Sequence, residues 1–414
     1  MAKMFGRLLD PKVREALKDT PVVVLTGARQ TGKSTLAKGL IGAAFPAGYV
    51  TLDNLAARAA AQSDPHGFLA GHRGPLVIDE VQHAPDLFPA IKEAVDADRK
   101  SGAFLLTGSA NVLLLPQISE SLAGRAQRFT LWPLSQGELG GKPDRFAEAL
   151  FASRTLAVKG SGDLRRDTLR RALRGGFPEA ISRSTHARRA AWFGAYVESL
   201  LERDVRSLAK IEGLAELPDL LALVAARSSS LLNESELSRT LGLVVKTLSR
   251  YLTLLERLYL VSRIPAWSRN LGHRVVKHPK IVISDSGLMS HLQKVELARY
   301  DVDPTLAGPL LETFVLCELM RQIGWCSIPT SLYHFRTHAG EEVDAVLERR
   351  DGLLVGIEVK ARSTVDGDDF KGLRALAAAA GKKFVRGVVL YTGTSTVPFA
   401  ANLHAVPINA LWEL

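Results

Sequence analysis

The chain has 414 residues, of which 46% are hydrophobic and 23% charged, a composition ordinary for a globular protein of two or three domains. Its net charge of +10 and pI of about 9.6 favour a polyanionic partner, because each neutralised phosphate releases a counterion. The two cysteines, Cys317 and Cys326, exclude a four-cysteine zinc site and a disulfide-dependent scaffold.

The sequence carries no sign of membrane insertion or export. No apolar run approaches the roughly 20 residues that a membrane span requires. The first residues become charged too early for a signal peptide. We therefore expect a cytoplasmic protein with no membrane partner.

A phosphate-binding loop is encoded near the start of the chain. The apolar strand Val22–Thr26 runs directly into Gly27–Ser34, which fits the pattern G-x-x-x-x-G-K-S and leads into a helix. Such glycines let backbone N–H groups approach phosphates, while Lys33 would reach the β- and γ-phosphates and Ser34 would bind magnesium. The predicted cofactors are therefore ATP and Mg²⁺. The predicted nucleotide contacts in this loop are Gly27, Gly32, Lys33, Ser34 and Thr35.

A second element of the same site is the apolar strand Pro75–Glu80, which ends in two carboxylates. The carboxyl ends of parallel strands deliver ligand-binding residues. Asp79 would hold magnesium through water, and Glu80 would polarise the attacking water as the catalytic carboxylate. The alternative, that both carboxylates only cap the next helix, is disfavoured by the phosphate-binding loop upstream.

A third strand, Ala103–Thr107, is followed by polar residues that can sense the γ-phosphate. Ser109 is our first choice for this role and Asn111 the second. Downstream, Arg125 has two equal interpretations. It is either a catalytic arginine finger offered to the nucleotide of a neighbouring subunit, or a surface arginine in a turn. The first interpretation implies a homo-oligomer.

The middle of the chain, from about 146 to 208, is helical in pattern and strongly basic, with a turn at Gly175–Glu179. This segment is a helical lid of the ATPase, a nucleic-acid contact, or both. A solvated helix face is the commoner explanation of a charge run. The clustered arginines are Arg165, Arg166, Arg170, Arg171, Arg174, Arg188 and Arg189.

Between about 217 and 264 the pattern is that of a helix-turn-helix. Asn233 is placed to cap one helix, with Glu236 at the second position of a capping box, and Gly242 ends that helix. The buried face of the next helix is predicted to be Leu248, Leu252 and Leu255. The residues predicted to bind DNA are Lys246, Thr247 and Arg250. Arg263 and the basic stretch 269–280 would form a wing, and the alternative is a winged helix used only for packing or protein contacts.

The last part of the chain has the pattern of a helix, three strands and a helix. Because side chains alternate along a strand, Glu358 and Lys360 project to one face, where Asp344 of the neighbouring strand joins them. Such carboxylates would bind Mg²⁺, with Glu312 as a further metal ligand and Lys360 as a catalytic group that acts on water or on the phosphorane charge. The alternative is a solvated hairpin with alternating charges, although a lone carboxylate in an apolar strand is costly.

The chain also carries an ordered set of short motifs: Gly27–Ser34, Val77–Glu80, Leu106–Ser109, Leu122–Arg125, Pro133–Ser135, Gly175–Pro178, Leu201–Asp204, Asp285–Leu288, Glu342–Asp344 and Glu358–Lys360. Together they resemble a prokaryotic AAA-type ATPase family whose C-terminal region is a domain of unknown function, DUF4143. The resemblance covers nearly the whole chain. One mild departure is Ser286, where a threonine is expected.

The resemblance implies an α/β fold: an AAA-type P-loop parallel sheet, then a winged helix-turn-helix, then a small restriction-endonuclease-like domain of the PD-(D/E)xK kind. The predicted segments are an ATPase core at 1–145, a basic helical lid or linker at 146–212, the winged helix-turn-helix at 213–295 and the nuclease-like domain at 296–414.

Four functions remain open at this point. The first is an ATP-driven motor that remodels duplex or branched DNA, and the second is an ATP-regulated endonuclease. In the third, only the ATPase is active, and the nuclease-like domain binds DNA or a protein. The fourth is a signalling ATPase that acts on proteins.

Overall fold

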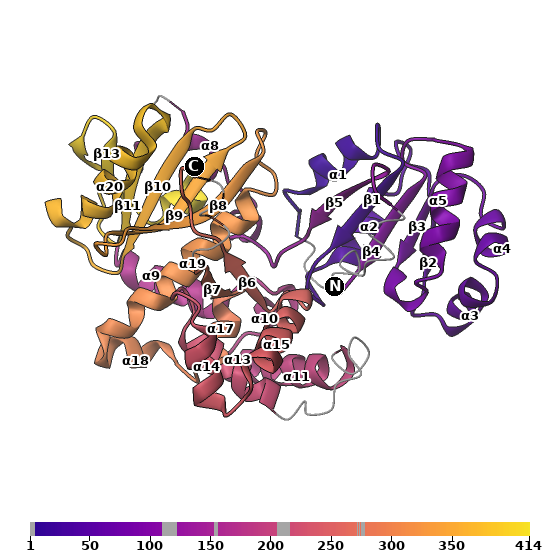
Figure 1. Ribbon diagram of the computed structural model, residues 1–414, viewed down its shortest axis with the longest axis horizontal. Helices are drawn as coiled ribbons and strands as arrows, with labels where there is room; N and C mark the ends of the chain where they lie inside the picture. Colours follow the sequence, from indigo (N-terminus) through magenta and orange to yellow (C-terminus); the bar gives the residue numbers. More distant parts are fainter. Residues whose placement is uncertain are drawn as a thin grey trace. The chain divides into compact units, whose positions relative to one another are not determined.

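The computed structural model describes residues 5–109, 122–152, 156–204, 216–270, 272, 274 and 278–414. The chain divides into two compact units (Figure 1). The N-terminal unit comprises residues 6–133 with 257–259, and the C-terminal unit comprises residues 134–256 and 260–414 together with residue 5. The four predicted segments are a finer division, and they stay a prediction.

Within its described residues, the N-terminal unit is built on a five-stranded sheet in the order β2-β3-β4-β1-β5, and every pair is parallel. The strands are β1 (Val22–Thr26), β2 (Gly48–Thr51), β3 (Leu76–Asp79), β4 (Phe104–Gly108) and β5 (Ala126–Thr130). Both β1 and β3 are buried throughout, as expected for central parallel strands covered on both faces. The predicted parallel sheet is confirmed.

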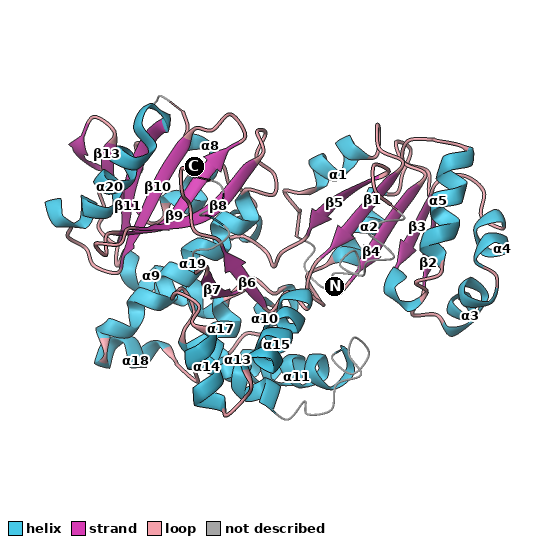
Figure 2. Cartoon of the chain, viewed as in Figure 1, coloured by secondary structure: helices cyan, strands magenta, loops and turns pink. Residues whose placement is uncertain are grey.

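Helices accompany these strands, as Figure 2 shows. They are α1 (Asp10–Ala16), α2 (Lys33–Leu40), α3 (Leu55–Ser63), α4 (Pro65–Ala70), the 3₁₀ turn η1 (Val81–His83) and α5 (Leu87–Ala97). Apolar residues of α1, α2 and the sheet form one buried cluster, including Val13, Leu36 and Val23. Burial of such side chains stabilises the unit by about 1.5–3 kcal/mol each.

The C-terminal unit begins with helices. They are α7 (Gln136–Gly140), α8 (Phe146–Ala149), α9 (Leu164–Arg174), α10 (Pro178–Ile181), α11 (His186–Ser199), the π-helical turn η3 (Leu200–Asp204), α13 (Leu217–Ala226), α14 (Glu234–Leu241) and α15 (Val245–Arg257). Two antiparallel strands follow, β6 (Val261–Ile264) and β7 (Lys280–Ile283). Then come α17 (Ser286–Leu292), α18 (Leu297–Val302) and η5 (Pro304–Leu306).

The rest of this unit is a mixed sheet. Over the described residues its strand order is β12-β13-β11-β10-β9-β8, with β8, β9 and β10 antiparallel and β10, β11 and β13 parallel. The elements are α19 (Ala307–Gln322), β8 (Thr330–Arg336), β9 (Glu342–Arg349), β10 (Leu354–Lys360), η6 (Gly367–Phe370), α20 (Lys371–Ala380), η7 (Gly381–Lys383), β11 (Phe384–Tyr391), β12 (Val397–Ala400), β13 (Leu403–Pro407) and α21 (Ala410–Glu413). The predicted succession of helix, three strands and helix is confirmed.

Several of the ordered motifs meet in one buried contact inside the C-terminal unit. The Asp285 carboxylate accepts the Gly176 N–H at 2.8 Å and pairs with the Arg321 guanidinium at 3.0 Å. A Cβ at Gly287 would lie 2.8 Å from the Gly175 nitrogen, so only glycine permits the approach. These motifs therefore fix the packing of α9, and of the glycine turn that ends it, against the start of α17.

Candidate functional site

The phosphate-binding loop connects β1 to α2 and depends on its two outer glycines. Gly27 has φ +147°, and a Cβ there would lie 2.2 Å from the Leu131 carbonyl oxygen. Gly32 has φ +95° and is the N-cap residue of α2. Both conformations favour glycine, which explains why the chain turns from strand to helix at this pattern.

Lys33 begins α2 and is buried. Its Nζ donates to the carbonyl oxygens of Gly27 at 3.0 Å and of Ala28 at 2.8 Å, so the ammonium is held inside the loop. Arg7, which the sequence did not single out, donates to the carbonyls of Thr31 and Trp132, each at 2.7 Å. Arg7 thus ties the loop to the segment after β5.

The two predicted magnesium ligands of this site lie side by side. The Ser34 hydroxyl donates to the Asp79 carboxylate at 3.0 Å. Mg²⁺ is usually held by few protein oxygens together with waters and substrate phosphates. A serine hydroxyl beside a carboxylate at a phosphate-binding loop fits that ion. Thr35, in contrast, is exposed on the first turn of α2.

Two residues that sequence reasoning missed hold the Asp79 carboxylate. Tyr49 of β2 donates to one of its oxygens at 2.7 Å, and the Thr107 hydroxyl of β4 donates to the other. Burial, then the hydrogen bond to Asp79, raise the pKa of Tyr49, so this phenol stays a donor. Both residues come from strands that flank β3, which is a property of strand order and leaves no local signal.

The predicted catalytic carboxylate and the predicted sensor are linked by a third missed residue. Gln82 donates from Nε2 to the Glu80 carboxylate and, at 3.0 Å, to the Ser109 hydroxyl. Glu80 has φ +56°, and its N–H donates to the Thr107 hydroxyl at 3.3 Å. Ser109 follows β4, which lies between β1 and β3, so it lies at the carboxyl ends of these strands; its role as the γ-phosphate sensor stays a prediction. Asn111 lies outside the described residues.

Arg125 is placed away from these residues within its own chain. Its guanidinium pairs with the Asp96 carboxylate at 2.6 and 2.8 Å, and both side chains are partly exposed. That hydrogen bond raises the pKa of Arg125. A finger acting on a neighbouring subunit would have to leave Asp96, and this role stays a prediction.

The C-terminal candidate site has a lysine at its centre. Lys280, the first residue of β7, is 1% exposed. Among the described residues its Nζ contacts three carboxylates: Glu312 at 2.6 Å, Glu342 at 3.0 Å and Asp344 at 3.1 Å. Burial lowers the pKa of Lys280, but these carboxylates raise it by more, which keeps the ammonium charged. Lys280 ends the stretch 269–280 that was expected to form a basic wing, and because its ammonium is buried among carboxylates it is not available for a DNA contact.

The remaining predicted residues of this site are held by hydrogen bonds along β10. Asp344 accepts the Val359 N–H at 2.9 Å, and Lys360 donates to the Glu358 carboxylate at 3.0 Å. Burial, then Asp344, raise the pKa of Glu358, and the same two causes raise that of Glu312. The sheet does bring Glu312, Asp344 and Glu358 to one region, as predicted.

This cluster does not fit a divalent cation as it stands. The Lys280 ammonium takes the oxygens of Glu312 and Asp344 that a metal ion would need. Across the described part of the chain, no group of three or more histidine, cysteine or acidic side chains is arranged to hold a metal ion. Metal binding by Glu312, Asp344 and Glu358 stays a prediction that requires Lys280 to move.

The predicted DNA-contacting residues lie on α15. Lys246 and Arg250 are exposed and Thr247 is partly exposed, whereas Leu248, Leu252 and Leu255 are buried. Asn233 caps α14 by accepting the Glu236 N–H at 3.1 Å, and Gly242 ends it in the left-handed conformation. In this described helix the second hydrogen bond of a capping box, from the Asn233 N–H to the Glu236 carboxylate, does not form, because Glu236 pairs with Arg227 instead. Arg263 of the predicted wing is paired with Glu256 and Glu234.

Comparison with known proteins places this architecture in a family. An AAA domain matches residues 19–140, and a domain of unknown function, DUF4143, matches residues 307–411. The chain belongs to the AAA-domain proteins that carry a C-terminal DUF4143 domain. A further domain of unknown function, DUF8612, matches residues 165–299. The chain is 32% identical over 401 residues to the uncharacterized proteins Rv2008c of Mycobacterium tuberculosis and Mb2031c of Mycobacterium bovis, covering 97% of this chain and 83% of theirs.

Likenesses to solved structures are more distant. The Thermotoga maritima RuvB Holliday junction branch migration motor matches with a TM-score of 0.30 and 17% identity, over 67% of this chain and 92% of that one. Caenorhabditis elegans PCH-2 matches with a TM-score of 0.23 and 15% identity, over 59% and 66%. Scores this low carry no argument about what this AAA-domain protein does. Within the described residues, no helix is long and apolar enough to span a membrane.

Proposed function

We propose that this AAA-domain protein hydrolyses ATP and uses the turnover to act on DNA. The observation that carries the ATPase proposal is the contact between the Ser34 hydroxyl and the Asp79 carboxylate beside the phosphate-binding loop. It joins the loop at the end of β1 to the acidic end of β3 across the intervening β4. Phosphoryl transfer requires this combination of a phosphate cradle and a magnesium site.

Each residue of the site has a definite task in that reaction. Lys33 would release its loop carbonyls and neutralise the β- and γ-phosphates, while Ser34 and Asp79 would hold Mg²⁺, which offsets developing charge. Glu80 would orient the attacking water and accept its proton. Gln82 hydrogen-bonds to both Glu80 and Ser109, so loss of the γ-phosphate beside Ser109 would shift the position of the catalytic carboxylate.

The proposal of a DNA partner rests on charge and on the α14–α15 arrangement. The chain has a net charge of +10, and α15 exposes Lys246 and Arg250 while burying its leucines. Helix α14, a glycine turn, helix α15 and the antiparallel pair β6–β7 follow the order of a winged helix-turn-helix. We interpret α15 as the recognition helix for duplex or branched DNA.

The C-terminal domain is, on this proposal, a restriction-endonuclease-like fold that binds rather than cleaves. The Lys280 ammonium lies where a metal-dependent phosphodiesterase would need a cation. This favours the ATPase over an ATP-regulated endonuclease as the main activity. The domain would then serve to bind DNA or a protein partner.

The test is ATP hydrolysis by the purified chain in Mg²⁺, with and without linear duplex, single-stranded and four-way-junction DNA. We expect one DNA form to stimulate phosphate release, and no cleavage products in the same tubes. DNA cleavage that is lost in Asp344→Asn would instead support the endonuclease as the main activity. A Lys246→Gln variant should weaken the stimulation, and the exposed Lys382→Gln is its matched control. If no DNA changes turnover, the partner is a protein.

A further inference from the structure

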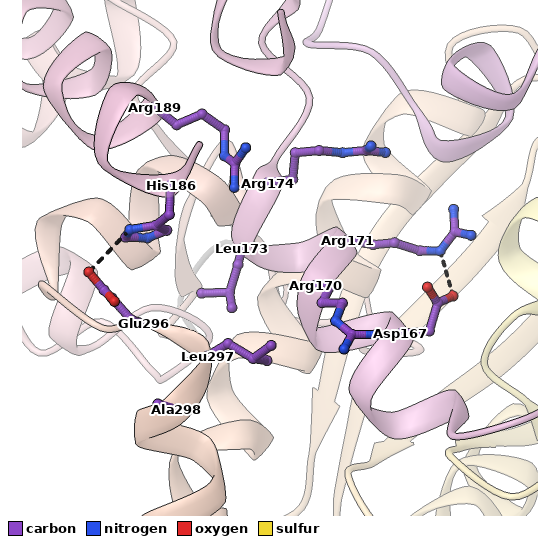
Figure 3. Close-up of a pocket in the computed structure, with 10 residues that line it drawn as sticks. All are labelled: Asp167, Arg170, Arg171, Leu173, Arg174, His186, Arg189, Glu296, Leu297 and Ala298. Carbon is purple, nitrogen blue, oxygen red and sulfur yellow. Dashed lines mark hydrogen bonds and ion pairs between the residues drawn. The ribbon is translucent and has the colours of Figure 1, made fainter. Parts of the chain in front are cut away.

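A cavity of about 530 Å³ lies in the C-terminal unit between α9, the start of α11 and the start of α18 (Leu297–Val302). Its size is within the range of roughly 300–1,000 Å³ usual for ligand sites. Figure 3 shows its lining, with Arg189 reaching from α11 toward α9. Its charged lining residues include Asp167, Arg170, Arg171, Arg174, Arg189 and Glu296.

The charges of this lining do not balance. Asp167 pairs with Arg171 at 2.8 Å, and Glu296 pairs with His186 at 3.2 Å. Both acidic residues are therefore already engaged. Arg170, Arg174 and Arg189 contribute three further guanidinium groups, and within the described residues none of them forms an ion pair with a carboxylate.

Other arginines of α9 behave differently. Arg166 pairs with Asp301 at 3.4 Å, and Arg165 donates to the Tyr300 carbonyl at 3.5 Å. In the described part of the chain, the arginines of α9 that have no such partner, Arg170 and Arg174, both line the cavity. The unbalanced charge is thus a property of the cavity and not of α9 as a whole.

Two of the three arginines are also partly withdrawn from water. The Nε atoms of Arg174 and Arg189 are buried and have no hydrogen-bond partner, although Nη1 of Arg189 donates to the Arg183 carbonyl at 3.1 Å. Burial, then the neighbouring Arg171 and Arg189, lower the pKa of Arg174. A buried guanidinium donor without an acceptor is costly, and a phosphate bound by the other N–H groups of these side chains would offset that cost.

We propose that this cavity binds a phosphate group, with Arg170, Arg174 and Arg189 as its ligands. The planar guanidinium fork matches phosphate oxygens, and arginine is the usual residue for such recognition. The phosphate belongs either to a small free ligand or to a nucleic-acid backbone, and both present the same oxygens. The inference concerns α9 and α11 and does not depend on the ATPase site.

The experiment compares Arg174→Gln/Arg189→Gln with Arg166→Gln/Arg188→Gln in the full chain. The second pair lies on the same two helices, carries the same charge change and lies outside the cavity. Both pairs are made in a Lys33→Ala background, which silences the phosphate-binding loop. Pyrophosphate binding is measured by titration calorimetry, and binding of a labelled single-stranded oligonucleotide by fluorescence anisotropy at several salt concentrations.

The first pair should bind one of the two probes at least tenfold more weakly, because each lost charge-assisted hydrogen bond is worth roughly a factor of ten. Loss confined to pyrophosphate identifies a small ligand. Loss of oligonucleotide binding, with a salt slope lower by about one per lost contact, identifies a nucleic-acid backbone. The control pair should bind pyrophosphate and the oligonucleotide with affinities close to those of the Lys33→Ala parent.

Equal affinities of the two variant pairs for both probes would overturn the proposal. If the first pair does not fold, Arg170→Gln replaces it, since Arg170 is exposed and its substitution leaves the packing intact. That variant should weaken the same probe. No tube contains ATP, so failure here is separate from failure of the proposed ATPase.

Discussion

The phosphate-binding loop and the Lys280 cluster each combine a buried lysine with carboxylates, but the lysine has different partners in the two places. At the loop, Lys33 sits on backbone carbonyls and leaves the Asp79 carboxylate to Ser34, Tyr49 and Thr107. In the cluster, Lys280 contacts the carboxylates directly. A phosphate and a metal ion can therefore enter the phosphate-binding loop, whereas in the cluster the Lys280 ammonium already occupies the place that a metal ion would take.

The difference shows what a short motif can and cannot specify. Gly27–Ser34 contains its own lysine and its own glycines, so its geometry follows from local conformation. Glu342–Asp344 and Glu358–Lys360 specify only which face of two strands is acidic. Whether a metal ion or an ammonium neutralises that face is decided by β7, which is far away in the sequence.

The largest effect is expected at the loop lysine. Lys33→Ala should abolish ATP turnover, because it removes the ammonium that would neutralise the β- and γ-phosphates. Phosphate release is the measurement, and the exposed Lys18→Ala is the control. Turnover at the parent rate would show that this loop is not the nucleotide site.

Glu80→Gln tests the catalytic half of the same centre. Glutamine cannot accept a proton from water, so turnover should fall by about 10²- to 10⁴-fold while nucleotide still binds. Binding of a fluorescent ATP analogue and phosphate release are measured on the same sample. Hydrolysis at the parent rate would remove Glu80 from the mechanism.

Lys280→Ala tests the other centre. Removing the ammonium leaves buried carboxylates without their cation, which should destabilise the fold by about 3–5 kcal/mol. Mn²⁺ or Mg²⁺ should then raise the Tm of the variant and not that of the parent, since a bound ion stabilises the state that binds it. The exposed Lys382→Ala is the control. A parent Tm that rises equally with metal would show that Lys280 does not occupy the site.

The smallest effect is expected at Asp144, a buried carboxylate without a lysine. Burial, then the neighbouring Glu318, raise the pKa of Asp144 to about 7. The folded chain thus holds this proton more tightly than the unfolded chain, so stability falls as pH rises from about 4 to 7. Asp144→Asn should remove this loss, a gain of a few kcal/mol at about pH 8 and almost none at about pH 4.

Urea unfolding at several pH values measures that gain. The amide oxygen introduced by Asp144→Asn can still accept the Gly137 N–H that the Asp144 carboxylate accepts at 3.1 Å, so the packing is preserved. The exposed Asp219→Asn is the control. A gain that is the same at every pH would show that Asp144 does not titrate in this range.

The sequence by itself determined the features that depend on neighbouring residues. Strand β1, the glycine turn and α2 follow from a buried apolar run, two positive-φ glycines and a helix start. The cap at Asn233, the end of α14 at Gly242 and the leucine face of α15 follow from local hydrogen bonding and helical periodicity. The alternation that puts Glu358 beside Lys360 follows from strand geometry.

Only the tertiary structure decided which distant side chains meet. Tyr49 and Thr107 reach Asp79 because β2 and β4 flank β3, and Lys280 reaches Glu312 and Asp344 because β7 is packed near α19 and β9. Such pairings come from strand order and helix packing, which bring together residues with no fixed spacing in the chain. Short motifs do not predict these pairings, because the pairings are selected by the free energy of burying the whole sheet and its helices.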